Sequence, residues 1–498
     1  MRLLSIASAA LVLHSISAQQ ILDVWTTTQD KGSLLKGTQP STSINFGTPG
    51  TAGNADISVD DSKVYQTIYG FGATLTDSSA KLFDGLKSNN SDEYWKLMDY
   101  MFNVTDGANS GALSYIRVSI GASDFSDTEY SWDDTNNDTT LAKFSADAAP
   151  SYLFSTLTDI LSINSNIMIH ALPWSAPGWM KDPVGMNGGT LASGNEDLLA
   201  NYLLKALQAF KSKDIPIFSI AIQAGPLQIN EPENADGSLP STDMPYDTEA
   251  TVGKSLRGLM NDNGFTDVKL IGFEHNWNHA DAYPVQLMDA AADSFDGVSF
   301  HCYGDGSVYQ DQANFTSKYP DKEVFFTECS GTIGSDWWSD IKSNTDKITI
   351  GSLEYGSSSA MIWNLALDSS GGPKLPGADS CNGGCRGVVT INSDGTWTAN
   401  QEFYALGQAA KAIVPKDPNG PYGKRIGVSV SGGQDWALRV GAYKTERVSS
   451  SDPARYSLVV LNWNDGSSDG TVNSTIEFNG KQAAYSFPVG VTTLSWYA

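Results

Sequence analysis

Two glutamates, Glu231 and Glu328, each stand at the end of an apolar segment, LQIN before the first and EVFFT before the second. Two facing carboxyl groups can share acid–base work, because one can protonate a leaving oxygen while the other attacks carbon or activates water. This is the chemistry of glycosidic bond cleavage, and it requires neither a metal nor a cofactor. Glu328 taken alone could equally be a structural carboxylate paired with Arg117.

Other apolar segments also end in polar or aromatic side chains. These are Arg117, Asp124, His170, Trp174, Asn230, His275, Asn276, His301, Tyr303, Trp363 and Asn364. Parallel barrels gather their strand ends at one mouth, so we expect these side chains to surround the glutamates. Six tryptophans could offer flat faces to sugar rings, although any one of them could equally pack the core: Trp174, Trp179, Trp277, Trp337, Trp338 and Trp363.

Short apolar segments alternate with helical ones between residues 65 and 413. Runs that are apolar throughout are typical of strands buried on both faces, and helical stretches such as 198–213 separate them. The fold class predicted is therefore α/β, with residues 65–413 forming a (β/α)8 TIM barrel. The predicted strand segments are 114–120, 167–173, 217–223, 268–274, 297–303, 323–329 and 359–365.

The two ends of the chain have a different pattern. Residues 414–498 contain alternating runs bounded by Gly, Ser or Asp, which indicate an antiparallel sheet without helices. Residues 19–64 are strand-like and rich in Gly and Thr. We expect a small β-sandwich built from both chain ends.

Residues 1–18 have the layout of a cleaved secretory signal, with Arg2 before an apolar run and small residues at the end. We therefore expect a secreted, extracellular protein without a membrane-spanning segment, and we expect a monomer. Five Asn-x-Ser/Thr sequons are candidate glycosylation sites: Asn89, Asn103, Asn137, Asn314 and Asn473.

The net charge of −25 repels phosphate backbones, so nucleic acid is not an expected partner, whereas a neutral polysaccharide is compatible with it. The chain has four cysteines. Cys381 and Cys385 are spaced so that they could close a short disulfide, while Cys302 and Cys329 are interpreted as small buried hydrophobic residues. Too few thiolate and imidazole ligands are present for a zinc site, so no metal is expected.

Six motifs resemble, in order, those of glycoside hydrolase family 30, which includes glucosylceramidases and fungal endo-β-1,6-glucanases. The resemblance covers essentially the whole mature chain. The motifs are YGFGATLTDSS (69–79), HALPWSAPGWMK (170–181), INEPEN (229–234), SFHCYGD (299–305), FFTECSG (325–331) and MIWNLALD (361–368).

The resemblance implies a retaining enzyme in which Glu231 is the acid/base and Glu328 the nucleophile, roughly 5 Å apart. It implies that Asn230 binds the sugar 2-hydroxyl and that Arg117 keeps Glu328 ionised. Asn364 is a further candidate for substrate binding. The residues implied to line the sugar subsite are Asp77, Trp174, His301, Tyr303 and Trp363.

The sequence departs from the family at AGPLQI (224–229), which stands between the strand-like IAIQ and Asn230. Pro226 and Gly225 do not suit a strand, so the hexapeptide must leave the sheet. Either IAIQ is the strand and the hexapeptide makes a detour, or the strand slips by six residues; codons retained from an intron would also produce it.

The substrate expected is a β-glucan, specifically β-1,6-glucan of fungal walls, because TECSGTIGSDWWSD (327–340) most resembles the fungal endo-β-1,6-glucanases. The alternatives are a glucosylceramidase or xylanase of the same family. A further alternative is a carbohydrate-binding barrel inactivated by the insertion at 224–229.

Overall fold

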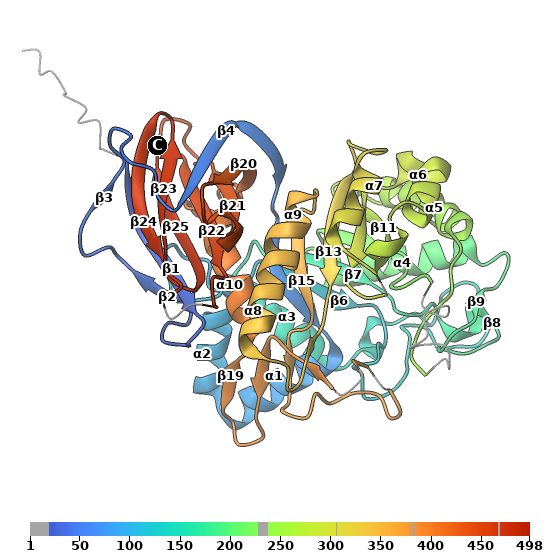
Figure 1. Ribbon diagram of the computed structural model, residues 1–498. Coiled ribbons are helices and arrows are strands. Elements are labelled where there is room, and N and C mark those ends of the chain that lie inside the picture. Colours follow the sequence, from blue (N-terminus) through green and yellow to red (C-terminus); the bar gives the residue numbers. More distant parts are fainter. Residues whose placement is uncertain (1–18, 228–237, 305, 379, 382–383, 467–468) are drawn as a thin grey trace, which may run out of the picture.

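The computed structural model describes residues 19–227, 238–304, 306–378, 380–381, 384–466 and 469–498. A barrel and a separate sheet domain lie side by side, with the sheet domain built from the blue and red ends of the chain (Figure 1). The eight barrel strands are β5 (Gly70–Leu75), β6 (Tyr115–Ser119), β7 (Met168–Leu172), β10 (Ser219–Ala221), β11 (Lys269–Asn276), β12 (Gly297–His301), β13 (Glu323–Glu328) and β15 (Ser359–Asn364).

Neighbouring barrel strands pair in parallel, in the order β13-β12-β11-β10-β7-β6-β5-β15. A parallel bridge between Val324 and Ser357 joins β13 to the start of β15. The Ser358 N–H also donates to the Val324 carbonyl at 2.7 Å. The sheet is therefore nearly closed, and the predicted barrel is confirmed.

The glycine-rich strand β5 is not among the segments predicted from apolar runs. A Cβ at Gly72 would come within 1.7 Å of the Tyr115 carbonyl oxygen on β6. The close approach of these two strands requires glycine there. Glycine interrupts the run of apolar residues, so the apolar pattern does not identify this strand.

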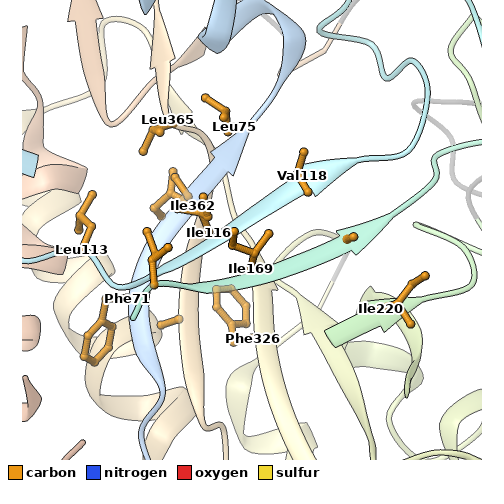
Figure 2. Close-up of a cluster of buried hydrophobic side chains, with 14 of the residues drawn as sticks. Phe71, Leu75, Leu113, Ile116, Val118, Ile169, Ile220, Phe326, Ile362 and Leu365 are labelled. Atoms are coloured by element: carbon orange, nitrogen blue, oxygen red, sulfur yellow. The ribbon is translucent and has the colours of Figure 1, made fainter. Parts of the chain in front are cut away.

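Helices cover the outside of the barrel, and apolar side chains fill the space between helices and strands. Phe71, Ile116, Ile169 and Ile220 project from neighbouring strands into this layer (Figure 2). The helices are α1 (Asp77–Asn89), α2 (Ser91–Phe102), α3 (Ser151–Ile163), α4 (Glu196–Ser212), α5 (Tyr246–Asp262), α6 (Tyr283–Ala291), α7 (Gln312–Thr316), α8 (Trp337–Ser343), α9 (Ser352–Glu354) and α10 (Gln401–Ile413).

Large side chains also fill the barrel interior. Tyr115, Ile271, Phe325 and Met361 belong to one buried cluster, distinct from the layer under the helices. Tyr115 points inward and its neighbour Ile116 outward, as the alternation of a strand requires. The barrel is a packed core, and its polar side chains are left to the strand ends.

Both ends of the chain build the second domain, as predicted. Its strands form one sheet in the order β2-β1-β25-β22-β21-β20-β4-β23-β24, with β3 paired to β1. Apolar residues from both ends, including Ile21, Ile57, Phe478 and Trp496, share a core. The strands are β1 (Gln20–Thr28), β2 (Lys36–Thr38), β3 (Ile44–Asn45), β4 (Ala55–Thr67), β20 (Lys424–Ser431), β21 (Leu438–Thr445), β22 (Arg455–Asn462), β23 (Val472–Phe478), β24 (Lys481–Phe487) and β25 (Gly490–Tyr497).

Helix α10 joins the two domains. It packs against β5 of the barrel and against β1, β22 and β25 of the sheet domain. The side chain of Gln408 on this helix lies within hydrogen-bond distance of Thr27 Oγ1 (2.9 Å) and of Thr493 Oγ1 (2.8 Å). The chain passes from the sheet domain to the barrel between the end of β4 at Thr67 and the start of β5 at Gly70. It returns to the sheet domain after α10, where β20 begins at Lys424.

Strand β10 identifies which of the two interpretations of the insertion holds for the described residues. Ser219, Ile220 and Ala221 pair with β11, so the IAIQ segment supplies the strand. The N–H groups of Ala224 and Gly225 then donate to the two strands that flank β10, to the Pro173 carbonyl just after β7 at 3.0 Å and to the Glu274 carbonyl on β11 at 2.9 Å. The strand has therefore not slipped by six residues.

All four cysteines form disulfides in the structure. Cys302 bonds to Cys329, and Cys381 bonds to Cys385. The second pair is the one suggested by its spacing. The interpretation of Cys302 and Cys329 as isolated buried hydrophobic residues was wrong, because β12 and β13 are neighbours and both cysteines directly follow these strands.

The candidate glycosylation sites differ in exposure. Asn103 is half-buried, and its side chain donates to Asp99 at 2.9 Å. The other four are exposed: Asn89, Asn137, Asn314 and Asn473. Glycosylation stays a prediction. Among the described residues, the helices are too short or too polar to cross a lipid bilayer.

Candidate active site

Glu328 is the last residue of β13 and lies at the barrel mouth, 8% exposed. Its Oε2 accepts a hydrogen bond from Arg117 Nη2, and Tyr303 also hydrogen-bonds this carboxylate. Burial and the negative charge of Glu328 raise the pKa of Tyr303 well above its usual value. The phenol therefore stays protonated and can donate to the carboxylate.

Arg117 is fully buried on β6, and side chains from other barrel strands and strand ends hold it in place. Its Nε donates to Thr74 Oγ1 at 2.9 Å, and its Nη1 lies 3.4 Å from Glu274 Oε2. The guanidinium carbon is 4.9 Å from the ring centre of Trp174 and 5.0 Å from that of Trp363. Arginine remains charged at all relevant pH values, so it sets a permanent positive charge against the Glu328 carboxyl group.

Trp174 and Trp363 stack on each other, with ring centres 4.8 Å apart and an interplanar angle of 26°. Both follow or end barrel strands, and both lie next to Arg117. Trp277 and Trp338, in contrast, pack in the layer under the helices. Of the six tryptophans proposed for the rim, the structure thus brings Trp174 and Trp363 together beside Glu328.

Asp124 is a carboxylate that the strand-end pattern predicts for the barrel mouth, although the resemblance does not assign it to the sugar subsite. Burial raises its pKa to about 6; a hydrogen bond from Ser380 opposes this rise, and the charge of Glu328 adds to it. Trp363 also hydrogen-bonds it. In the sequence, the feature that points to Asp124 is its position shortly after a barrel strand, in the segment ASDFS that follows β6.

Asp77, predicted for the sugar subsite, has different partners. It is the first residue of α1, and its Oδ2 accepts from Ser126 Oγ at 2.7 Å and Tyr130 Oη at 2.9 Å. Burial raises its pKa to about 6. The structure thus places Asp77 against the loop that follows Asp124, and its Oδ1 is buried without a hydrogen-bond partner among the described residues. Its role in the sugar subsite stays a prediction.

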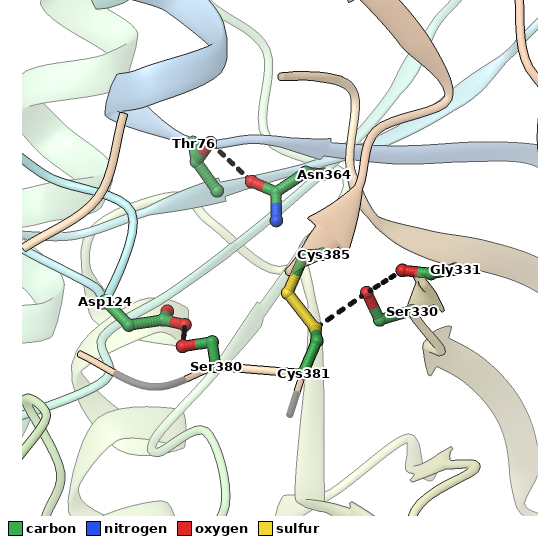
Figure 3. The surroundings of a disulfide bond; sticks show 8 residues. All are labelled: Thr76, Asp124, Ser330, Gly331, Asn364, Ser380, Cys381 and Cys385. Carbon is green, nitrogen blue, oxygen red and sulfur yellow. Dashed lines mark hydrogen bonds between the residues drawn. A yellow bond between two sulfur atoms is a disulfide. The ribbon is translucent and has the colours of Figure 1, made fainter. Parts of the chain in front are cut away.

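Asn364, at the end of β15, is fully buried. Its Oδ1 accepts from Thr76 Oγ1 at 2.9 Å, and Thr76 also caps the N-terminus of α1 (Figure 3). These contacts give Asn364 a role in holding β5 to β15. Its Nδ2 has no hydrogen-bond partner among the described residues.

The Cys381–Cys385 disulfide lies close to Ser330, which stands two residues after Glu328 (Figure 3). Cys381 Sγ is 3.1 Å from Ser330 Oγ. Ser380, next to it, donates to Asp124. The segment around this disulfide therefore connects the loop after β13 with the loop after β6.

His301, at the end of β12, is nearly buried, and its Nε2 is 3.2 Å from Glu274 Oε2. Its ring meets that of Tyr303 edge-on. The predicted site residues that the structure brings together are therefore Arg117, Trp174, His301, Tyr303, Glu328 and Trp363.

The predictions for Asn230 and Glu231 lie outside the described residues, as does the expected separation of the two glutamates. Within the described ranges, His, Cys, Asp and Glu side chains form no group of three or more suited to a metal ion.

Comparisons with known proteins show what the chain is similar to. The chain is 29% identical over 417 residues to an endo-1,6-β-D-glucanase of Neurospora crassa, covering 80% of this chain and 79% of that protein. It is 30% identical over 383 residues to an endo-1,6-β-D-glucanase of Trichoderma harzianum, covering 73% of each. The solved structure of an endo-β1,6-glucanase superposes with a TM-score of 0.78 at 26% identity, covering 96% of this chain and 99% of that one.

The description "Glycosyl hydrolase family 30 TIM-barrel domain" matches residues 68–412. That range holds every barrel strand and the whole arrangement around Glu328. The chain therefore belongs to glycosyl hydrolase family 30 and is a glycoside hydrolase.

Proposed function

We propose that this glycoside hydrolase is a secreted, retaining endo-β-1,6-glucanase. The observation that carries the proposal is Glu328, held at the barrel mouth by a buried arginine and a tyrosine hydroxyl. A carboxylate held by a charge-assisted hydrogen bond beside a stacked tryptophan pair suits nucleophilic attack on a sugar ring. The linkage is proposed from relatives named as endo-1,6-β-D-glucanases.

The proposed reaction is a double displacement. Glu328 attacks the anomeric carbon and the glycosidic oxygen leaves, taking the proton of Glu231, so that a glycosyl ester on Glu328 forms. Glu231 then removes a proton from water, whose oxygen attacks the same carbon and releases Glu328. Each step inverts the carbon, so the product keeps the configuration of the substrate.

The residues around Glu328 support this role. Arg117 and Tyr303 stabilise the Glu328 carboxylate in the free enzyme. As the ester forms, the carboxylate loses its charge, and the two residues would remain hydrogen-bonded to its second oxygen. Asp124 lies where a hydroxyl of the bound sugar could meet it, beside Trp363 and Glu328. Secretion is proposed from residues 1–18, and the net charge of −25 is compatible with a neutral polymer.

Two other functions are separated from this one by the same assay. A putative glucosylceramidase of Caenorhabditis elegans is 29% identical over 380 residues, covering 72% of this chain and 69% of that protein. A barrel inactivated at 224–229 would bind glycan without cleaving it.

The test incubates the full secreted chain with β-1,6-glucan, xylan and glucosylceramide, and measures reducing ends, ceramide and the anomer first released by NMR. The proposal expects short β-1,6-linked oligosaccharides released as the β-anomer. Cleavage of xylan or glucosylceramide alone would assign the other substrate. Binding of β-1,6-glucan without release would favour the inactive barrel.

A further inference from the structure

Strand β11 contains a bulge just before it reaches the barrel mouth. Its pairing with β12 shifts register between Gly272 and His275. Phe273 and Glu274 have φ values of 76° and 51°, which non-glycine residues rarely adopt. Such conformations cost about 1–3 kcal/mol each and persist only where the surroundings enforce them.

The bulge changes which side chain enters the barrel. Ile271 belongs to the interior cluster, so regular alternation would also turn Phe273 inward. Phe273 instead packs outward against Tyr283 of α6 and Phe300, with ring centres 5.3 and 5.7 Å away. The extra residue allows Glu274 to point into the barrel, which is a known effect of bulges near active sites.

Inside the barrel, Glu274 is fully buried and is contacted by four donors from four strands or strand ends. Its Oε1 is 2.7 Å from His170 Nε2. Its Oε2 accepts from Thr327 Oγ1 at 2.9 Å and also lies 3.2 Å from His301 Nε2 and 3.4 Å from Arg117 Nη1. Arg117 is therefore shared between two carboxylates, Glu274 and Glu328.

We propose that Glu274 is a positioning residue for the nucleophile: it fixes the guanidinium of Arg117 and the ring of His301 so that Arg117 presents one amino group to Glu328. The proposal rests on the proposed role of Glu328. Glu274 does not touch the sugar, because it is enclosed by these donors below the mouth.

The charges around Glu274 favour a permanent anion. Hydrogen bonds and the positive charge of His170 and His301 hold its pKa well below the usual range despite its burial. Arg117 faces it from β6, His170 from β7, His301 from β12 and Thr327 from β13. Among the described residues, Arg117, Tyr303 and Asp124 are titratable or charged groups that interact with Glu328.

The surroundings also hold the bulge itself. The N–H of Phe273 donates to Glu249 Oε1 of α5 at 3.0 Å, and the carbonyl of Glu274 accepts from the Gly225 N–H at 2.9 Å. Tyr283 Oη donates to the other oxygen of Glu249 at 2.8 Å. Two elements outside β11 thus stabilise a backbone that aims one carboxylate inward.

The test compares Glu274→Gln with the wild-type protein in trapping of Glu328 by 2-deoxy-2-fluoro-β-glucosyl fluoride, followed by intact mass. Fluoride leaves without protonation, so the result depends neither on Glu231 nor on the linkage cleaved in polymers. We expect the limiting rate of labelling to fall about 100-fold with the inhibitor affinity changed by less than about threefold.

The split between rate and affinity separates positioning from a merely structural role. Loss of a merely structural residue would lower the amount of folded protein, and hence the amplitude of labelling, but not the limiting rate at saturating inhibitor. A Glu274→Gln protein with the wild-type limiting rate would overturn the proposal.

Glu402→Gln is the matched control. Glu402 is equally buried, on α10, and is bound by Arg386 rather than Arg117. It should lower the melting temperature and leave the limiting rate of labelling unchanged. If Glu274→Gln does not fold, Thr327→Val removes one donor to Glu274 and should slow labelling about fivefold; an unchanged rate would overturn the proposal. Absence of labelling in the wild type would instead disprove the proposed nucleophile and the role that depends on it.

Discussion

Cys302 and Cys329 form a disulfide that ties the end of β12 to the end of β13. Each cysteine directly follows a residue of the site, His301 or Glu328. The N–H of Cys302 also donates to the Glu328 carbonyl at 3.1 Å. The backbone positions of Tyr303 and Glu328, whose side chains must meet, are thus linked covalently.

The double variant Cys302→Ala/Cys329→Ala should therefore lose activity as well as stability. We expect a fall in kcat of about tenfold, because small displacements of catalytic groups are costly. The free energy of unfolding should fall by about 3–4 kcal/mol for a loop of 27 residues. Urea unfolding and kcat on the cleaved glycan measure both.

The Cys381–Cys385 disulfide provides a comparison for the loss of stability. Cys381 and Cys385 are four residues apart, so their removal should cost only about 2 kcal/mol of stability. If the Cys302→Ala/Cys329→Ala protein kept wild-type kcat, the covalent link would have no part in positioning Glu328.

Glu328→Ala tests the nucleophile directly. We expect kcat to fall by at least about 1000-fold, because the glycosyl ester of the proposed mechanism forms on Glu328. Azide is small enough to enter the space left and should restore turnover with an activated glycoside, giving the α-glycosyl azide. Glu323→Gln, at the opposite end of the same strand, is the control and should keep its activity. Near-normal turnover of Glu328→Ala would refute the assignment.

Much of this fold could be predicted from the sequence, because strands buried on both faces must be apolar throughout. The segments around Ile116, Ile169 and Phe325 carry that signal. Glu328 could also be found, since the end of a barrel strand is where a carboxylate can reach a shared mouth.

What could not be predicted depends on contacts between distant segments. The partner of Cys302 follows from the pairing of β12 with β13, which no spacing reveals. The inward aim of Glu274 depends on a bulge that breaks the alternation on which sequence patterns rely. The hydrogen bond from Ser380 to Asp124 joins residues 256 positions apart, so the sequence alone could not predict it.

Asp77 should make stability depend on pH. Its pKa is raised from 3.8 to about 6 by burial, so between these values the folded state binds more protons than the unfolded state. Stability contributed by the protonated form is therefore lost as pH rises through this window. Asparagine does not titrate, so the Asp77→Asn variant should not lose stability in this way as pH rises.

The measurement is urea unfolding at pH 4, 5, 6 and 7. The stability of Asp77→Asn relative to wild type should rise with pH by up to about 3 kcal/mol across the window. Asp84→Asn changes an exposed carboxylate on the same helix and serves as control. A difference between Asp77→Asn and wild type that stays constant with pH would contradict the prediction.

Deletion of residues 224–229 should give an enzyme at least as active as the full chain. Because β10 ends at Ala221 and the chain has not slipped, Gln223 is already at the strand end, where its Nε2 donates to the Trp174 carbonyl at 2.5 Å. In the deletion variant Asn230 and Glu231 would follow Gln223 directly, at the mouth that holds Glu328.

The assay compares kcat/KM of the deletion variant and the full chain on the same glycan, with circular dichroism to verify folding. A gain of about 100-fold or more would mean that the hexapeptide displaces the proton donor by about 1 Å or more. The fluoride-leaving inhibitor needs no proton donor, so its rate of reaction with Glu328 should be similar in both proteins. A folded deletion variant that reacts with the inhibitor but cleaves no glycan would show that Glu231 acts only from the longer loop.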